Sequence, residues 1–202
     1  MILTVLTGDI VDSTKLDSAA LDQAMLALSD AASEISGWDS APSLFGRSSG
    51  DGWQLALGNP ARGLRAALYL QACLRRLDKS LASRMSLATG EGHLPENQDV
   101  NSAHGAVFVS SGRLLDRISG HIHMAHSGCG TKNATLVLAD YISQGWTQAQ
   151  ARSLCEMLPP DAGPREEAAK RLGVSRPAVN QALWSAGFPA LDTAIKDWEH
   201  SE

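Results

Sequence analysis

Strand-like patterns occur only in the first 125 residues of the chain, and helical patterns alone follow them. The strands and helices of the first part come in the order βαββαβ, with extra elements. This order predicts an α/β (α+β) fold of the ferredoxin-like, split βαβ type, in which an antiparallel sheet is covered by helices on one face. The expected elements span residues 2–6, 16–35, 43–45, 53–57, 59–78, 84–89, 107–118 and 120–125.

The second part is predicted to be all-α. Its expected helices lie at residues 134–143, 148–158, 165–172, 176–185 and 191–198. Residues 127–131 contain serine and glycine and indicate a linker. We therefore expect two domains, an α/β domain at residues 1–127 and an all-α domain at residues 132–202.

Residues 165–180 carry the pattern of a helix-turn-helix, in which a turn joins two short helices. Gly173 permits the turn, and Ser175 is suited to cap the second helix, with Pro177 in its first turn. The core of this unit is expected to contain the apolar residues Leu172, Val174, Val179 and Leu183. The pattern predicts an all-α helix-turn-helix domain.

Polar side chains at the start of the second of these helices indicate DNA recognition, because Arg, Asn and Gln suit bidentate contacts with base edges. The residues expected to contact DNA are Ser175, Arg176, Asn180 and Gln181, with Lys170. A formal net charge of −5 argues against broad attraction to nucleic acid, so binding has to rest on a local patch. The alternative is a helical unit that makes only protein contacts.

Two carboxylates are placed where they can meet. Asp9 follows the first expected strand, and Asp51 lies in the turn of an expected hairpin. On neighbouring strands they provide two oxygen ligands for Mg²⁺ and a bound triphosphate. Asp12, Ser13 and Thr14 lead into a helix, whose first N–H groups favour a phosphate site. The alternative is that Asp12 or Ser13 only caps this helix and Asp51 only makes a turn.

Residues 8–13 read G-D-I-V-D-S, which resembles the start of the SatD family. The same segment is similar to the D-I-x-G-[FS]-T motif of class III nucleotidyl cyclase domains, which also have a later G-D. The likeness continues at residues 50–52, 84–91 and 112–114, and SatD-like proteins similarly end in a helix-turn-helix. It covers nearly the whole chain.

This resemblance implies a site for Mg²⁺ and a nucleotide. The implied metal ligands are Asp9, the carbonyl of Ile10 and Asp51, and Arg113 would approach the phosphates. Arg47 stands where the cyclases carry a base-recognising Lys and would contact the nucleotide. Because class III cyclase domains place their sites at a dimer interface, the resemblance also implies a homodimer.

Three positions depart from the cyclase pattern. Val109 stands where the cyclases have a transition-state Asn, Arg47 replaces the Lys, and Asp12 replaces a Gly. Losing one preorganised donor costs on the order of a hundredfold in rate, which argues against efficient catalysis. We expect a DNA-binding regulatory protein whose degenerate cyclase-like domain binds a nucleotide or mediates dimerisation. The alternatives are a Mg²⁺-dependent enzyme acting on a nucleoside triphosphate, with Arg113 as a catalytic residue, and a scaffold for protein contacts.

The remaining features bear on location and metals. The N-terminus lacks the basic region of a signal peptide, and no apolar run approaches the roughly 20 residues that span a bilayer. We therefore expect a cytoplasmic protein without membrane contact. The three cysteines lack C-x-x-C spacing and are expected to be reduced thiols. His121, His123 and His126 form a short cluster with Cys129 that suits Zn²⁺, although no second pair of ligands is evident.

Overall fold

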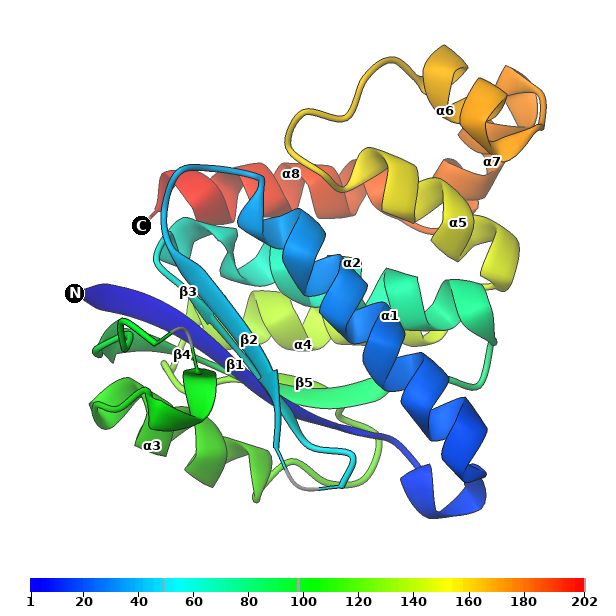
Figure 1. Ribbon diagram of the computed structural model, residues 1–202. Helices are drawn as coiled ribbons and strands as arrows, with labels where there is room; N and C mark the ends of the chain where they lie inside the picture. The colour runs from blue at the N-terminus through cyan, green and yellow to red at the C-terminus, as the bar shows by residue number, and fades with distance from the viewer. Residues whose placement is uncertain (49, 98, 202) are drawn as a thin grey trace.

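The computed structural model describes residues 1–48, 50–97 and 99–201, and a five-stranded sheet forms its centre (Figure 1). The strand order is β2-β3-β1-β4-β5. Strand β5 runs parallel to β4, and the other neighbours are antiparallel. The predicted βαββαβ order is therefore found. The strands are β1 (Ile2–Ile10), β2 (Ser43–Arg47), β3 (Trp53–Leu57), β4 (Ser83–Glu91) and β5 (Met124–His126).

Helices surround this sheet and make up the whole of the chain after it. The α-helices are α1 (Ser18–Ser36), α2 (Gly63–Leu77), α3 (Ala106–Leu115), α4 (Thr131–Gln144), α5 (Gln148–Met157), α6 (Arg165–Leu172), α7 (Arg176–Ser185) and α8 (Phe188–His200). Three short 3₁₀ helices lie at Ser13–Lys15, Pro60–Arg62 and Val100–Ser102. No helix among the residues that the structure describes has the length and apolar character needed to cross a membrane.

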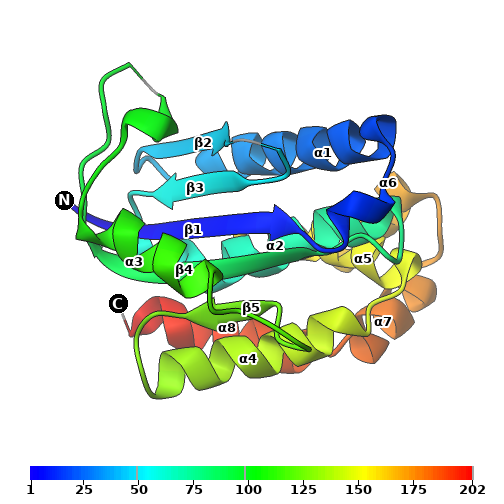
Figure 2. The ribbon, with the colours of Figure 1, turned by 90° about the horizontal axis from the view of Figure 1, so that it is seen from below.

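Helices cover both faces of the sheet, so the prediction of one covered face is wrong. Successive strand residues point to opposite faces. Leu6 of β1 belongs to the large core that contains α1 and α2, whereas Leu3 and Val5 belong to a smaller core with Val107 of α3. Figure 2 shows α3 in front of β1 and β4, with α2 behind them. The apolar side chains of β1 require cover on both sides.

The C-terminal helices pack against the sheet part through α2. Every residue from Gly63 to Leu74 is buried. One continuous hydrophobic core contains Leu64 of α2, Leu154 of α5 and Val179 of α7. The two predicted parts therefore share apolar surface. The division into domains at residues 127–132 remains a prediction.

Two arginines bind the last helix to the sheet part. Nε and Nη2 of Arg65 donate to the two carboxylate oxygens of Glu199, at 2.6 and 3.0 Å. Nη1 of Arg62 donates to the same carboxylate at 2.8 Å, and Nη1 of Arg65 donates to the carbonyl of Leu158 at the end of α5. The side chains of Arg65 and Glu199 are only 8% and 16% exposed. We call these three charged residues the Glu199 clamp.

Candidate functional site

Asp9 lies near the end of β1, directly opposite Arg84 of β4. Nε and Nη2 of Arg84 donate to the two carboxylate oxygens of Asp9 at 2.9 and 2.6 Å. This is a bidentate, charge-assisted pair, the strongest class of side-chain hydrogen bond. Both partners are partly open to solvent, with 21% of the Asp9 side chain and 40% of the Arg84 side chain exposed. The guanidinium thus neutralises the carboxylate of Asp9.

Asp51 lies in the turn between β2 and β3, at the same end of the sheet. Its neighbour Trp53 pairs with Gly8, so the turn lies beside the end of β1. The hydrogen bonds to Asp9 raise the pKa of the Arg84 guanidinium against the effect of partial burial, and the charges of Asp9 and Asp51 raise it further. The two carboxylates therefore lie at the same end of the sheet, and the charges of both act on Arg84. Their convergence on one ion remains a prediction.

This arrangement does not fit a Mg²⁺ ion. Arg84 donates to both carboxylate oxygens of Asp9, and its positive charge repels a divalent cation, so Mg²⁺ would have to displace the guanidinium. Among the described residues, no group of three or more His, Cys, Asp or Glu side chains is placed to hold a metal ion. Ile10, the third implied ligand, is buried and pairs with Ser83. The metal roles of Asp9, Ile10 and Asp51 remain predictions.

A Mn²⁺ titration tests the role of Arg84. We expect no saturable binding by the wild-type protein and weak binding by Arg84→Gln, because this change removes the cation and frees both carboxylates. Electron paramagnetic resonance of free Mn²⁺ measures the difference, with Arg75→Gln as the matched control. Saturable binding by the wild-type protein that Asp9→Asn abolishes would show that the guanidinium gives way to a metal.

The segment after β1 differs from the predicted helix start. Asp12 has left-handed backbone angles and forms an exposed ion pair with Lys15, at 2.8 Å. Helix α1 begins only at Ser18, and Asp17 caps it by accepting a hydrogen bond from the N–H of Ala20. The alternative in which Asp12 or Ser13 caps this helix is therefore wrong, because the carboxylate of Asp17 takes that position. Nucleotide contacts by Asp12, Ser13 and Thr14 remain predictions.

Of the two implied arginines, Arg47 lies on the other face of the sheet from Asp9. Arg47 pairs with Trp53 on the sheet face that α1 covers, and its guanidinium donates to Asp22 of α1 at 2.9 Å. Asp9 lies on the opposite face. Arg113 is exposed on α3, and Ser111 of that helix contacts the sheet instead. The contact of Arg113 with phosphates remains a prediction.

Helices α6 and α7 form the predicted pair around a tight turn. Gly173 has a φ of 67°, the left-handed conformation that glycine adopts most readily. Oγ of Ser175 accepts a hydrogen bond from the N–H of Ala178 at 3.3 Å and caps α7. Val179 and Leu183 are buried, as predicted, but Val174 is 49% exposed. The core role predicted for Val174 is wrong, since this residue lies in the turn and points outward.

The exposed surface of α7 is polar at its start and aromatic at its end. Arg176 and Gln181 are exposed, and Trp184 is 68% exposed. Asn180 is half-buried, and its Oδ1 accepts a hydrogen bond from Arg165 at 3.0 Å. Lys170 is exposed on α6, with Glu166 at 3.8 Å. Of the predicted DNA-contacting residues, Ser175, Asn180 and Lys170 therefore have partners within the protein, whereas Arg176 and Gln181 are exposed.

The predicted histidine cluster does not assemble a metal site among the described residues. Nδ1 of His126 accepts a hydrogen bond from the N–H of Gly128 at 2.9 Å. Burial lowers the pKa of His123, although the charge of Asp140 opposes this effect. The Asp140 carboxylate also accepts a hydrogen bond from the backbone N–H of His123 at 2.7 Å. These contacts hold the loop before α4 in place.

Comparison with known proteins does not identify a family for the chain. No family model matches the chain, and no curated protein is similar to it. The solved structures that it resembles include the guanylyl cyclase Cya2, with 17% sequence identity and a TM-score of 0.46. That match covers 62% of this chain and 74% of the cyclase. Membership of the SatD family and the likeness to nucleotidyl cyclase domains stay predictions.

Proposed function

We propose that the chain is a DNA-binding regulatory protein that places the start of α7 in the major groove. The observation that carries this proposal is the α6–α7 pair, joined by Gly173 and capped by Ser175, with Arg176 and Gln181 exposed at the start of α7. In helix-turn-helix proteins, the first residues of the second helix contact base edges. An Arg side chain can form two hydrogen bonds with the edge of guanine, and a Gln side chain can form two with the edge of adenine.

The sheet part has a supporting role in this proposal. Because Arg84 neutralises Asp9, a catalytic Mg²⁺ has no free carboxylate there in this conformation. The sheet part then acts by binding a nucleotide without a metal or by joining two copies of the chain. A homodimer would present two α7 helices to two half-sites, which compensates for the modest charge of each unit. The alternative of an enzyme acting on a nucleoside triphosphate requires Arg84 to leave Asp9.

Selection from a random duplex library, followed by affinity measurement, tests the proposal. We expect Arg176→Ala with Gln181→Ala to weaken binding to the selected duplex by at least about tenfold, because each bidentate base contact contributes about 1–3 kcal/mol. Lys170→Ala should weaken binding to all duplexes alike and reduce the salt dependence by about one charge. Arg117→Ala, at the end of α3, is the control.

Two results would count against DNA binding. The first is failure to enrich any duplex, and the second is unchanged affinity of the Arg176→Ala, Gln181→Ala variant. Sedimentation of the complex counts the copies of the chain on each duplex. Metal-dependent turnover of ATP or GTP that Asp51→Asn abolishes would favour the enzyme instead.

A further inference from the structure

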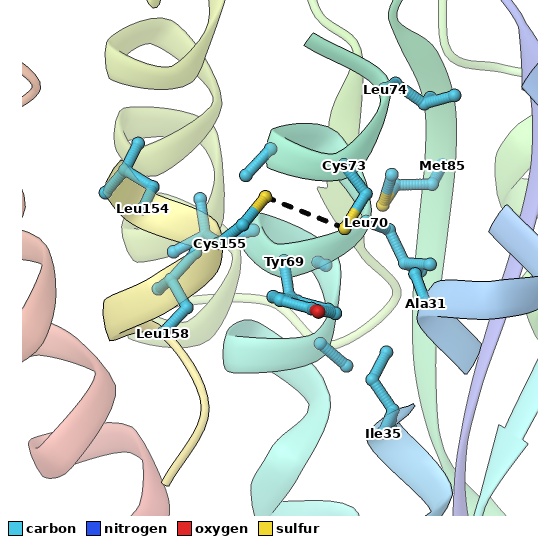
Figure 3. Packing of buried hydrophobic residues seen from close by; sticks show 14 of the residues in the cluster. Ala31, Ile35, Tyr69, Leu70, Cys73, Leu74, Met85, Leu154, Cys155 and Leu158 are labelled. Atoms are coloured by element: carbon cyan, nitrogen blue, oxygen red, sulfur yellow. Dashed lines mark hydrogen bonds between the residues drawn. The ribbon is translucent and has the colours of Figure 1, made fainter. Parts of the chain in front are cut away.

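Two cysteine thiols lie side by side in the core between α2 and α5. The Sγ atoms of Cys73 and Cys155 are 3.7 Å apart, and both side chains are buried (Figure 3). Leu70, Leu154 and Leu158 lie around them in Figure 3. The sulfur atoms of a disulfide are about 2.05 Å apart, so they have to approach by roughly 1.7 Å. A small rotation of the two side chains can provide this approach.

A surface hollow gives small molecules access to this pair. The hollow has a volume of about 570 Å³ and lies between α1, α2, α5 and α6. Cys155 forms part of its wall, together with Arg76, Asp161 and Arg171. A water molecule occupies about 30 Å³ in the liquid, so molecules of the size of hydrogen peroxide fit easily. Cys155 therefore borders the hollow, and Cys73 is buried behind it.

The surroundings favour a thiolate in the pair. Cys73 and Cys155 share a hydrogen bond in which either sulfur can be the donor. This hydrogen bond lowers the pKa of Cys73, while burial opposes this shift and the charge of Arg76 supports it. The same hydrogen bond and burial raise the pKa of Cys155. These opposite shifts favour loss of the proton from Cys73 before that of Cys155. Thiolates, and not thiols, attack peroxides and disulfides.

We propose that Cys73 and Cys155 are a redox site that a small peroxide oxidises to a reversible disulfide. The thiolate attacks one oxygen of hydrogen peroxide, the O–O bond breaks, and the products are a sulfenic acid and hydroxide. The proton lost by the first thiol converts this hydroxide to water. The sulfur of the second cysteine then attacks the sulfenic sulfur as it loses its proton, and the hydroxyl group leaves with that proton as water. In total, two thiols lose two hydrogens, and one peroxide becomes two waters.

The disulfide would connect the two parts of the chain. Cys73 belongs to α2, which packs on the sheet, and Cys155 belongs to α5, which packs on α6 and α7. The bond closes a loop between residues 82 positions apart, and cross-links over long loops restrict the unfolded chain most. We expect oxidation to raise the Tm by several degrees. This inference does not rest on DNA binding.

Peroxide treatment of the full chain in the Cys129→Ser background tests the proposal. We expect both remaining thiols to disappear from a thiol titration while the protein loses the mass of two hydrogens. Peptide mapping should show Cys73 joined to Cys155, and dithiothreitol should restore both thiols. Cys73→Ala and Cys155→Ala should each form no internal disulfide. Unreacted thiols, a sulfinic acid, or only intermolecular cross-links in the protein that retains both cysteines would overturn it.

The rate of oxidation tests the contribution of the cationic wall. Arg76→Gln should slow disulfide formation by about threefold to tenfold, because one pKa unit changes the thiolate fraction by up to tenfold. Arg75→Gln is the matched control, since its neighbouring charge is Asp78. Equal rates for the two variants would show that Arg76 does not activate the pair.

Discussion

Replacing Glu199 with alanine is expected to lower the free energy of unfolding by about 3 kcal/mol, because it leaves the buried Arg65 without its counter-ion. Arg62 keeps a longer ion pair with Asp39, at 3.4 Å. The side chain of Arg65 is 8% exposed and that of Arg62 is 21% exposed, so water can replace the lost carboxylate only in part. Urea denaturation measures the effect. Asp192→Ala is the matched control on the same helix, where it removes an exposed pair with Lys196. That pair should contribute about 0.5 kcal/mol or less.

The effect of Glu199→Ala should depend on pH. Burial opposes ionisation, but the hydrogen bonds and charges of Arg65 and Arg62 hold the pKa of Glu199 below its ordinary value of 4.5. A carboxylate with a lowered pKa in the folded state stabilises the protein fully above the unfolded pKa. This contribution is lost as the pH falls through the folded pKa. The difference between wild type and variant should therefore be constant near neutral pH and shrink in acid, and a constant difference in acid would contradict this account.

Gly8→Ala is expected to cost about 3 kcal/mol, at the upper end of the range for adding one methyl group to a packed core. A Cβ atom at Gly8 would lie 2.4 Å from Cζ2 of Trp53 and 2.6 Å from the carbonyl oxygen of Arg84. Trp53 is fully buried, and its Nε1 donates to Oγ of Ser83 at 3.0 Å, so the ring cannot move aside freely. The close contact explains why a glycine precedes Asp9.

A double-mutant cycle separates this contact from the general cost of a substitution in β1. Trp53→Leu destabilises the protein by itself, but it removes the ring atoms that a methyl group at Gly8 would meet. Gly8→Ala should therefore cost less in the Trp53→Leu background, and strictly additive costs would contradict the argument. Gly112→Ala is the control. No atom lies within 4 Å of its added Cβ, and alanine in a helix should stabilise α3 by up to about 1 kcal/mol.

The sequence predicts the order of strands and helices in this protein but not that helices cover both faces of the sheet. The run from Ile2 to Leu6 indicates a buried strand, yet consecutive apolar residues also mean that both faces need cover. The apolar residues on the second face of β1 are those that α3 covers. The turn at Gly173 and the cap at Ser175 were predicted because each depends on local chemistry. The apolar pattern predicts a core position for Val174. Its exposure depends on the orientation of the turn, which the pattern does not give.

In the candidate site, too, local features can be predicted from the sequence and long-range contacts cannot. The positions of Asp9 and Asp51 follow from a strand end and a hairpin turn, which are local features. The pair between Asp9 and Arg84 depends on the register of β1 and β4, which lie 75 positions apart at this point. No periodicity in the sequence fixes such a register. The Glu199 clamp, which joins residues 134 positions apart, was missed for the same reason.

The burial of α2 has a consequence for how the whole chain unfolds. One side of this helix supports the sheet, and the other supports α5 and α8. If the C-terminal helices separated from it, Arg65 would lose its partners and apolar side chains of α2 would meet water. If the sheet part unfolded first, α5 and α8 would lose the helix that supports them. Loss of structure in either half would impose a free-energy cost on the other, so we expect the whole chain to unfold in one cooperative transition.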